Sequence, residues 1–300
     1  MSTVEQSDLA GIPGGTAPED VARLRRARRA ELVRGLLHSK TFMIGAAMVA
    51  VWVISALFWR WITPYDPQAV DPINTLKAPS TSHWFGTDNL GRDVFSRVIA
   101  GAAPVLTVAP LATALGLLGG ITLGLITGFY RGWVDDVFSR VVDALLAFPL
   151  IILAVLVLAS LGRSPRNVIL VIGIIFTPLI ARTVRSAVLI EREREYVAAA
   201  RLRGERGPRI MVFEILPNIT GPITVEGTIR LGYAIFAAAT LAFLGLGIQD
   251  PSPDWGLQVA NARAYVQIAW WMAIFPALAL STLVVGVNLV ADGIRRVLEE

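Results

Sequence analysis

The chain has 300 residues, of which 54% are hydrophobic and 17% are charged, and its formal net charge is +4 at pH 7. This balance is too apolar for an ordinary soluble domain and is typical of an integral membrane protein. Cysteine is absent and the two histidines, His38 and His83, lie far apart in the sequence, which argues against disulfides, thiolate metal sites and a histidine-rich metal centre.

The first forty residues are basic and precede the first apolar stretch. The segment "VARLRRARRAELVRGLLHSK" resembles a transit peptide or a nucleic-acid-binding arm in its arginine content. Transit peptides avoid acidic residues, whereas the first forty residues of this chain contain five of them: Glu5, Asp8, Glu19, Asp20 and Glu31. We therefore expect a basic amphipathic flank on the cytoplasmic leaflet, ahead of an uncleaved first span. Residues 1–20, rich in glycine, proline, serine and acids, are expected to be disordered.

Six apolar stretches approach the ~20 residues that a helix needs to cross the ~30 Å hydrocarbon core of a bilayer. They lie near residues 41–59, 101–128, 141–161, 167–189, 221–247 and 269–290. The second stretch contains "LGLLGGITLGLITG", whose small residues allow helices to pack closely in a membrane. Prolines at positions 104, 110, 149, 178, 222 and 276 are expected to kink the helices. The pattern predicts an all-α, polytopic membrane bundle of about six helices and shows no β-barrel alternation.

The basic residues predict the orientation, because cytoplasmic flanks retain lysine and arginine. With the N-terminus inside, nineteen basic residues lie on the cytoplasmic side and seven outside, which places both termini in the cytoplasm. The chain then divides into five parts: an N-terminal tail (residues 1–40), a first transmembrane helix (41–61), an extracytoplasmic loop with an interfacial helix (62–100), a core of five transmembrane helices (101–290) and a C-terminal tail (291–300). A cytoplasmic loop over residues 190–218 interrupts the core.

The extracytoplasmic loop contains "HWFGTDNLGRDVFSRVIAGA", residues 83–102. Asp88 is a candidate N-cap for a helix that follows. That helix would have an apolar face (Val94, Phe95, Val98, Ile99) and a polar face (Arg92, Asp93, Ser96, Arg97). We expect an interfacial helix that sets the angle of the second span, in preference to a segment that contacts a solute.

A second polar stretch, "DPSPDWGLQVANARAYVQIAWW", precedes the last span. Tryptophan is enriched where a membrane meets water. Trp255, Trp270 and Trp271 are therefore expected to anchor the chain at the interface.

The most polar cytoplasmic segment is "EYVAAARLRGERGPRIMVFEILPN", Glu195 to Asn218. A first helix would end with Arg201 and Arg203 in its last turn and Gly204 as a left-handed cap. Pro208 suits the start of a second helix, which would end at Pro217. The apolar face of the second helix would consist of Ile210, Met211, Phe213 and Leu216.

Three interpretations of this segment compete. A solvated loop with cytoplasmic positive charge would not need a capped turn beside the small residues Ala198, Ala199 and Ala200. A DNA-binding helix–turn–helix is disfavoured because membrane spans hold both ends of the segment within a few residues. A knob that inserts into a groove of a cytoplasmic partner fits best.

At these residues the chain resembles a known family. Glu195–Pro217 is similar to the cytoplasmic coupling loop, or EAA loop, of binding-protein-dependent ABC importer permeases, with Gly204, Ile210 and Leu216-Pro217 in place. The segments "FGTDNLGRDVFSR", "GWVDDVFSRVVDALLAFP" and "FLGLGIQDPSPDWG" resemble the second permease subunit of dipeptide, oligopeptide and nickel importers. The likeness runs from about residue 30 to the C-terminus and implies the type I ABC importer permease fold.

The resemblance implies which residues shape or dock the coupling loop. They are Glu195, Tyr196, Ala199, Ala200, Arg201, Gly204, Ile210, Leu216 and Pro217. Two positions depart from the family pattern: Ala198 stands where a glutamate is frequent, and Glu214 where a histidine is frequent. These departures put in doubt particular contacts to the ATPase.

The resemblance also implies the partners: a homologous second permease, two cytoplasmic P-loop ATPases that bind ATP and Mg²⁺, and an extracytoplasmic solute-binding protein. The cargo would be a di- or oligopeptide, with nickel or another small solute as the alternative. The sequence agrees with ATP binding by separate subunits, because Lys40 and Lys77 are its only lysines and neither lies in a P-loop motif. The subunit is expected to bind no cofactor, to have no catalytic constellation and to contact no nucleic acid.

Two charged residues fall inside the fifth predicted span. Glu226 and Arg230 are four residues apart and can pair along one helix face. Charges inside spans usually face a cavity or each other, so the pair could line a translocation path or form a structural ion pair, and we favour the ion pair. Asp143 and Asp292 are expected to be boundary residues.

Two other classes of membrane protein compete with the importer permease. A secondary transporter driven by an ion gradient often has repeated halves, and no repeat is evident between residues 41–161 and 167–290. A membrane anchor or receptor would leave the kinked, glycine-rich core and the charges at Glu226 and Arg230 without a purpose.

Overall fold

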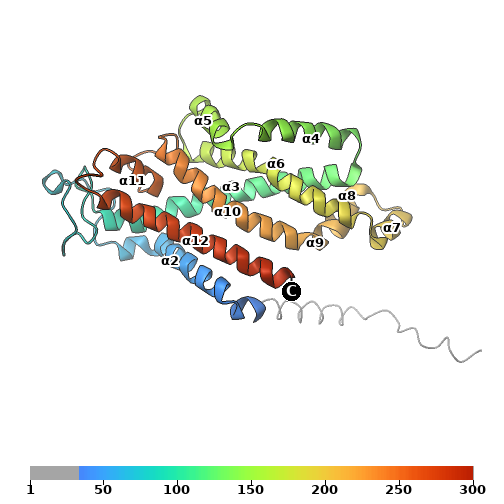
Figure 1. The fold of residues 1–300 in the computed structure, drawn as a ribbon, viewed down its shortest axis with the longest axis horizontal. Helices are drawn as coiled ribbons and strands as arrows, with labels where there is room; N and C mark the ends of the chain where they lie inside the picture. Colours follow the sequence, from blue (N-terminus) through green and yellow to red (C-terminus); the bar gives the residue numbers. More distant parts are fainter. Residues whose placement is uncertain (1–33, 300) are drawn as a thin grey trace, which may run out of the picture.

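The structure of the chain is a computed structural model that describes residues 34–299 (Figure 1). The predicted basic tail lies almost wholly outside the described residues. Within them the chain is helical, and one isolated β-bridge joins Thr87 to Asp93. The longest helices are α2 (Lys40–Ile62), α3 (Val94–Tyr130), α6 (Pro165–Glu191), α10 (Thr220–Phe243) and α12 (Trp271–Glu299). The all-α prediction is confirmed.

The centre of the bundle is the contact between α3 and α6. Four glycines spaced four residues apart form a stripe along α3: Gly116, Gly120, Gly124 and Gly128. A Cβ atom added to Gly124 would lie 2.6 Å from the Val184 Cβ, and one added to Gly128 would lie 2.8 Å from the Val188 Cβ. Side chains of α6 thus fill the space above the stripe, as the glycine-rich sequence predicts.

Among the described residues, four helices are long and apolar enough to cross a membrane: α2, α3, α6 and the first 27 residues of α12. Helix α10 has 24 residues and is long enough, but Glu226 and Arg230 lower its hydropathy. The remaining predicted span is not one helix. Helices α4 (Trp133–Leu146) and α5 (Leu150–Leu161) are bent by 87° at residues 147–149.

The third span predicted over residues 141–161 is therefore divided between two helices, where one kinked helix was expected. Pro149 has extended backbone (ψ 120°) and precedes the first residue of α5. A proline has no N–H to donate and disfavours a helical conformation in the residue before it, so the apolar run is broken there. The expected kink is a full break.

The boundaries of two other segments differ from the prediction. The expected interfacial helix and the second span form the single helix α3, which continues through Pro104 and Pro110. Its N-cap is Asp93, whose side chain accepts a hydrogen bond from the Ser96 N–H, and not Asp88 as predicted. Residues 291–299, expected as a tail, continue helix α12.

The two ends of the bundle are built differently (Figure 1). At one end lie the loop after α2, with the short 3-10 helix η1 (Pro72–Asn74), and α11 (Trp255–Ala262). At the other end, the segment between α6 and α10 folds into α7 (Glu195–Leu202), α8 (Gly207–Arg209), the π-helix η2 (Ile210–Ile215) and α9 (Leu216–Asn218).

Candidate functional site

The first helix of the predicted coupling loop, α7, is amphipathic. Val197 and Ala200 are 0% exposed and pack into the core. Tyr196 is half-buried, and its hydroxyl donates a hydrogen bond of 2.8 Å to Glu191 Oε2 at the end of α6. Burial and this hydrogen bond to a carboxylate raise the pKa of Tyr196 to about 12. The helix is thus fixed to the end of α6 by one face.

The turn after α7 has the predicted left-handed geometry. Gly204 has φ +77°, its N–H donates to the Arg201 carbonyl, and the Glu205 N–H donates to the Ala200 carbonyl. An added Cβ at Gly204 would meet nothing within 4 Å. The glycine is required there by its backbone conformation, since L residues with a Cβ are strained at positive φ.

The second half of the loop differs from the expected regular helix. Pro208 lies in its first turn, as predicted. In η2 the Leu216 N–H donates to the Met211 carbonyl, five residues earlier, which is the π-helical pattern. This wider turn shifts the buried face, so Ile210 and Ile215 are buried while Phe213 is 71% exposed. Phe213, expected on one apolar face with Ile210, Met211 and Leu216, instead lies at the surface, apart from the buried Ile210 and Met211.

Contacts to the end of α3 hold the loop in place. The Arg192 Nη1 donates to the Phe129 carbonyl at 2.7 Å, and the Arg201 guanidinium lies 5.3 Å from the Phe129 ring centroid. An added Cβ at Gly207 would lie 2.7 Å from the Tyr130 hydroxyl, which shows how closely the second half of the loop approaches α3. The loop therefore contacts α3 and α6 and leads directly into α10.

An ion-pair cluster connects the two halves of the loop. Arg203 Nη2 lies 2.8 Å from Glu205 Oε1 and 3.4 Å from Glu214 Oε1. Glu214, one of the two departures from the family pattern, therefore has a partner within the loop. Ala198, the other departure, is exposed.

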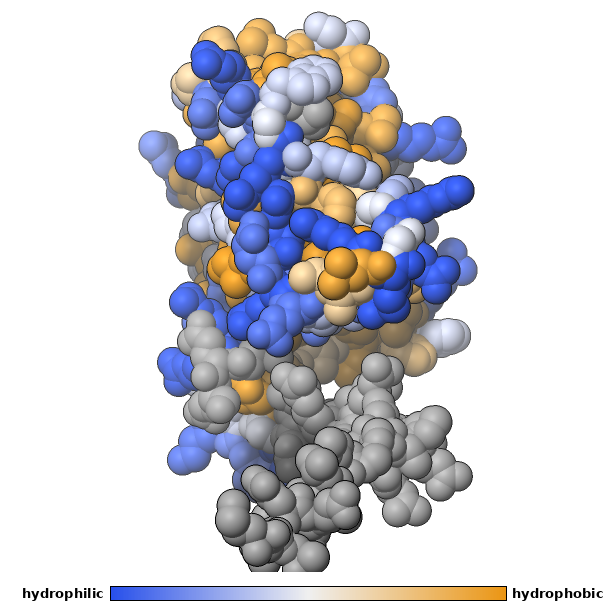
Figure 2. Space-filling model, turned by 90° about the vertical axis from the view of Figure 1, so that its right-hand side faces the viewer, coloured by the Kyte–Doolittle hydropathy of each residue, from blue (hydrophilic) through white to orange (hydrophobic). Residues whose placement is uncertain are grey.

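The outer face of the loop carries exposed apolar side chains among charges (Figure 2). Leu202 is 90% exposed, Phe213 71% and Val212 47%. Basic residues flank them: Arg201, Arg203, Arg206 and Arg209. We call the exposed residues Ala198, Leu202, Gly204, Val212 and Phe213 the coupling surface.

The predicted loop residues all lie in this one element, at different depths. Glu195, Arg201, Gly204 and Pro217 are exposed. Tyr196, Ala199 and Leu216 are half-buried, and Ala200 and Ile210 are buried. Sequence reasoning missed Leu202 and Phe213, whose exposure could have been suspected only from the exact register of the two helices.

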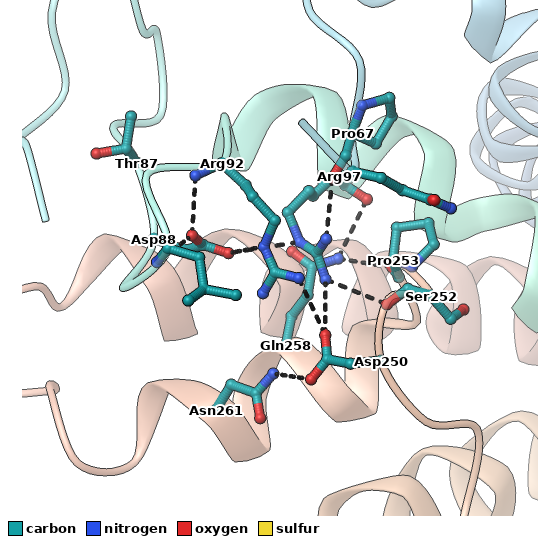
Figure 3. A network of polar contacts seen from close by, with 12 residues as sticks. Pro67, Thr87, Asp88, Arg92, Arg97, Asp250, Ser252, Pro253, Gln258 and Asn261 are labelled. Carbon is teal, nitrogen blue, oxygen red and sulfur yellow. Dashed lines mark hydrogen bonds and ion pairs between the residues drawn. The ribbon is translucent and has the colours of Figure 1, made fainter. Parts of the chain in front are cut away.

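The opposite end of the molecule contains a buried polar network that the sequence did not predict (Figure 3). Arg92 Nε donates to Asp88 Oδ2 at 2.6 Å, and Arg92 Nη1 donates to Asp250 Oδ1 at 3.0 Å. The Arg97 Nη1 and Nη2 atoms donate to the backbone carbonyls of Pro67 and Ser252. Arg97 is 1% exposed.

This network corrects the expected polar face of the interfacial helix. Arg92, Asp93, Ser96 and Arg97 are all buried. The segment around Asp250 and α11 contacts Arg92 and Arg97, and the loop after α2 contacts Asp93 through His83 and Ser96 through the Tyr65 N–H. Gln258 of α11 donates to the Arg97 carbonyl at 3.1 Å and to the Pro253 carbonyl at 2.7 Å. Segments more than 150 residues apart are thereby joined, in agreement with the predicted strut.

Two of the three predicted interface tryptophans are buried. Trp255 is 0% exposed and its Nε1 donates to the Val98 carbonyl, and Trp271 is 5% exposed and its Nε1 donates to the Thr87 carbonyl. Trp270 is 50% exposed. A buried indole needs an acceptor for its N–H, and the loop after α2 and the start of α3 supply these acceptors. The anchor prediction is wrong for Trp255 and Trp271.

The two charges within α10 form the predicted pair. Arg230 Nε donates to Glu226 Oε1 at 2.6 Å. Glu226 is 8% exposed, and the Arg230 guanidinium lies 5.9 Å from the Phe176 ring centroid of α6 and 5.7 Å from that of Tyr233. The structure thus places Glu226 and Arg230 at the α6–α10 contact, apart from the coupling loop.

The fold and the site define a multi-pass α-helical membrane protein with a folded loop at one end of its bundle. Residues 120–300 match the family described as the binding-protein-dependent transport system inner membrane component, and residues 28–79 match the N-terminal TM domain of oligopeptide transport permease C. The chain belongs to the family of binding-protein-dependent transport system inner membrane components.

Curated relatives cover nearly the whole chain. The dipeptide transport system permease protein DppC of Alkalihalophilus pseudofirmus is 39% identical over 287 residues, 96% of this chain and 94% of the relative. The glutathione transport system permease protein GsiD of Escherichia coli O6:K15:H31 is 42% identical over 258 residues, 86% and 85% of the two chains. A putative peptide transport system permease protein of Brucella suis biovar 1 is 39% identical over 266 residues, 89% and 90% of the two chains.

A solved structure has the same fold. An inward-facing conformation of the MetNI methionine ABC transporter superposes with a TM-score of 0.55 at 21% identity. The match covers 67% of this chain and 95% of that chain. The predicted type I ABC importer permease fold is therefore confirmed.

Proposed function

We propose that the chain is one of two permease subunits of an ATP-binding-cassette importer for di- or oligopeptides. Its family membership supports the permease role, and the dipeptide, glutathione and peptide relatives support the cargo. In this assembly the chain pairs with a homologous permease in the cytoplasmic membrane. An extracytoplasmic binding protein delivers the peptide, and two P-loop ATPases bind ATP and Mg²⁺ on the cytoplasmic side. Both termini of the chain lie in the cytoplasm.

The observation that carries the proposal is the coupling surface. Leu202 and Phe213 are far more exposed than apolar side chains beside a folded core usually are, and arginines flank them. An apolar centre with a charged rim suits a protein partner that buries the centre. In our proposal the partner is an ATPase, which receives the helical knob in a groove.

The connections of the loop explain how motion could reach the membrane. Helix α6 ends at Glu191 and α10 begins at Thr220, so both adjoin the loop closely. Arg192 and Arg201 contact the end of α3 at the same time. A rigid shift of the docked loop would therefore act on three helices together and change which side of the membrane the path opens to.

The test is the uptake of a radiolabelled dipeptide, alanyl-phenylalanine, in cells that lack the gene and in cells complemented with it. We expect complementation to restore uptake, arsenate to abolish it by depleting ATP, and a protonophore to spare it while glycolysis maintains ATP. Uptake that follows the proton gradient and not ATP would favour a secondary transporter. Complemented cells that import no peptide would overturn the proposed cargo.

A further inference from the structure

The ion pair in α10 is asymmetric, and this asymmetry points to a ligand. Glu226 is buried and is not among the residues that line the apolar groove between α5, α6 and α10, whereas Arg230 lines this groove. Arg230 uses its Nε atom for Glu226. Within residues 34–299, its Nη1 and Nη2 atoms have no hydrogen-bond acceptor in the structure. The outer half of the guanidinium fork therefore faces the groove with its donors unused.

The groove is large and its wall is almost entirely apolar. Its volume is about 490 Å³, and Arg230 is the one charged residue among the described residues that line it. The rings of Phe176 and Tyr233 lie against the guanidinium, and Phe236 adds a third aromatic side chain to the groove wall. Such a site suits a ligand that combines one anionic group with apolar side chains, because the anion receives the free donors and the side chains cover the wall.

The depth of Arg230 helps to identify the source of the anion. Arg230 is the eleventh of the 24 residues of α10. At a rise of ~1.5 Å per residue it lies ~15 Å along the helix, about halfway through a ~30 Å hydrocarbon core. Lipid phosphates remain at the membrane surface, so a headgroup is a poor candidate. A carboxylate at this depth would belong to a solute that crosses the membrane.

We propose that this groove is a transit site for the peptide, in which Arg230 receives the C-terminal carboxylate and the aromatic wall receives the neighbouring apolar side chain. This inference rests on the proposed function, because it takes a peptide as the cargo. Glu226 is then a positioning residue. It holds the Arg230 side chain toward the groove and reduces the cost of a cation inside the membrane.

Partial neutralisation of the Arg230 guanidinium by Glu226 would also limit how tightly the peptide is held, because the peptide carboxylate then meets less net positive charge. A site on a transport path must bind well enough to be occupied and weakly enough to release its ligand. In the absence of solute, Arg230 remains paired with Glu226. The pair therefore suits a site that is repeatedly filled and emptied.

The first test compares alanyl-phenylalanine uptake by Arg230→Gln, Arg230→Lys and the double variant Glu226→Gln/Arg230→Gln, at equal amounts of assembled complex. Loss of a charge-assisted contact predicts about a tenfold or greater fall for Arg230→Gln. Lysine keeps the charge and should retain more uptake. The double variant should remain as low as Arg230→Gln.

The double variant separates the transit site from a purely structural pair. If Arg230 only neutralises Glu226, removing both charges relieves the uncompensated charge and uptake returns to the wild-type level. That result, or full uptake by Arg230→Gln, would overturn the inference while leaving the proposed function in place. A wild-type complex that imports no peptide would instead overturn the proposed function and this inference with it.

The second test uses the absence of cysteine from the chain. Ala237→Cys places a thiol on the groove wall, and Ala238→Cys is a control on the adjacent, equally half-buried residue of α10 that does not line the groove. In the purified complex with its binding protein and ATP, alanyl-phenylalanine should slow maleimide labelling at position 237 and not at 238. Equal rates at position 237 with and without the peptide, or protection at both positions, would contradict occupancy of the groove.

Discussion

The two ends of this molecule handle charge in opposite ways. At the end that contains α11, Arg92 and Arg97 are buried and their donors are satisfied by carboxylates and carbonyls of the same chain. At the end that contains α7, arginines remain at the surface, and Leu202 and Phe213 are exposed between them. The buried charges of the first end are paired within the chain, whereas in our proposal the exposed surface of the second end binds another protein.

This difference teaches which substitutions should affect folding and which should affect assembly. Removing a group from the network around Arg97 leaves buried partners unsatisfied within one chain. Removing a group from the coupling surface leaves the isolated chain almost unchanged, because these side chains already face solvent. The predictions below apply this distinction to each end.

The largest expected effect is at Arg97. Arg97→Met should lower the free energy of unfolding by about 3–5 kcal/mol, because the Pro67 and Ser252 carbonyls lose their donors and Asp88 loses a neighbouring cation. Thermal unfolding of the purified chain in detergent measures the change. Arg163→Met, at an exposed site, is the matched control and should shift stability by less than about 0.5 kcal/mol. Equal effects of the two substitutions would contradict a structural role for the network.

The next effect is a pH dependence from Asp254, the N-cap of α11. Burial raises its pKa to about 6, so between about pH 4 and pH 6 the Asp254 carboxyl keeps a proton in the folded state that it has released in the unfolded state. Stability from this group is therefore present at low pH and is lost as the pH rises from about 4 through about 6, by a total of about 3 kcal/mol.

Asp254→Asn is the control for that pH dependence. The amide oxygen can still accept the Leu257 N–H bond that caps α11. We expect unfolding free energies measured between pH 4.5 and 7.5 to fall more steeply for the wild type than for the variant. Parallel pH profiles would show that Asp254 titrates normally in the folded chain.

A smaller effect on stability is expected at Gly204, together with a specific loss of function. Gly204→Val forces a β-branched residue to adopt φ +77°, at a cost of about 1–2 kcal/mol, and should reshape the turn while the bundle remains folded. Peptide uptake should fall, with the amount of membrane-inserted protein unchanged. Gly204→Asn, which tolerates the left-handed conformation, should retain most uptake. Disappearance of the valine variant from the membrane would indicate a folding role instead.

The smallest effect on the isolated chain is expected at Leu202. Leu202→Ser removes a side chain that is 90% exposed, so the free energy of unfolding should stay within about 0.5 kcal/mol of the wild type. Retention of co-purified ATPases should nevertheless fall severalfold, and Leu202→Met should preserve it. Unchanged retention for the serine variant would remove Leu202 from the docking contact.

Much of this architecture could be predicted from the sequence because its signals are local. Apolar length predicted the main helices, the glycine-rich second stretch predicted close helix packing, and Gly204 after two arginines predicted a left-handed cap. The order of charged and small residues also predicted a separate folded helical element between α6 and α10. These features depend on neighbouring residues and on helical periodicity.

The remaining features depend on distant parts of the chain. The burial of Arg92 and Arg97 requires Asp250 and Ser252, which follow more than 150 residues later, so a polar helix face was mistaken for a solvated one. Trp255 was mistaken for an anchor for the same reason. The π-helical turn was missed because the i→i+5 pattern changes the register without a marked change in composition.

The most direct test of the central claim, that another protein completes the α7 end, is site-specific crosslinking in native membranes. Leu202→Cys gives the chain a single thiol for a maleimide-benzophenone reagent, and Ile73→Cys, 85% exposed at the opposite end, is the matched control. Mass spectrometry then identifies the crosslinked proteins. The account predicts that position 202 captures a P-loop ATPase and that position 73 does not. Efficient labelling of position 202 without any protein adduct, in membranes that still import peptide, would contradict it.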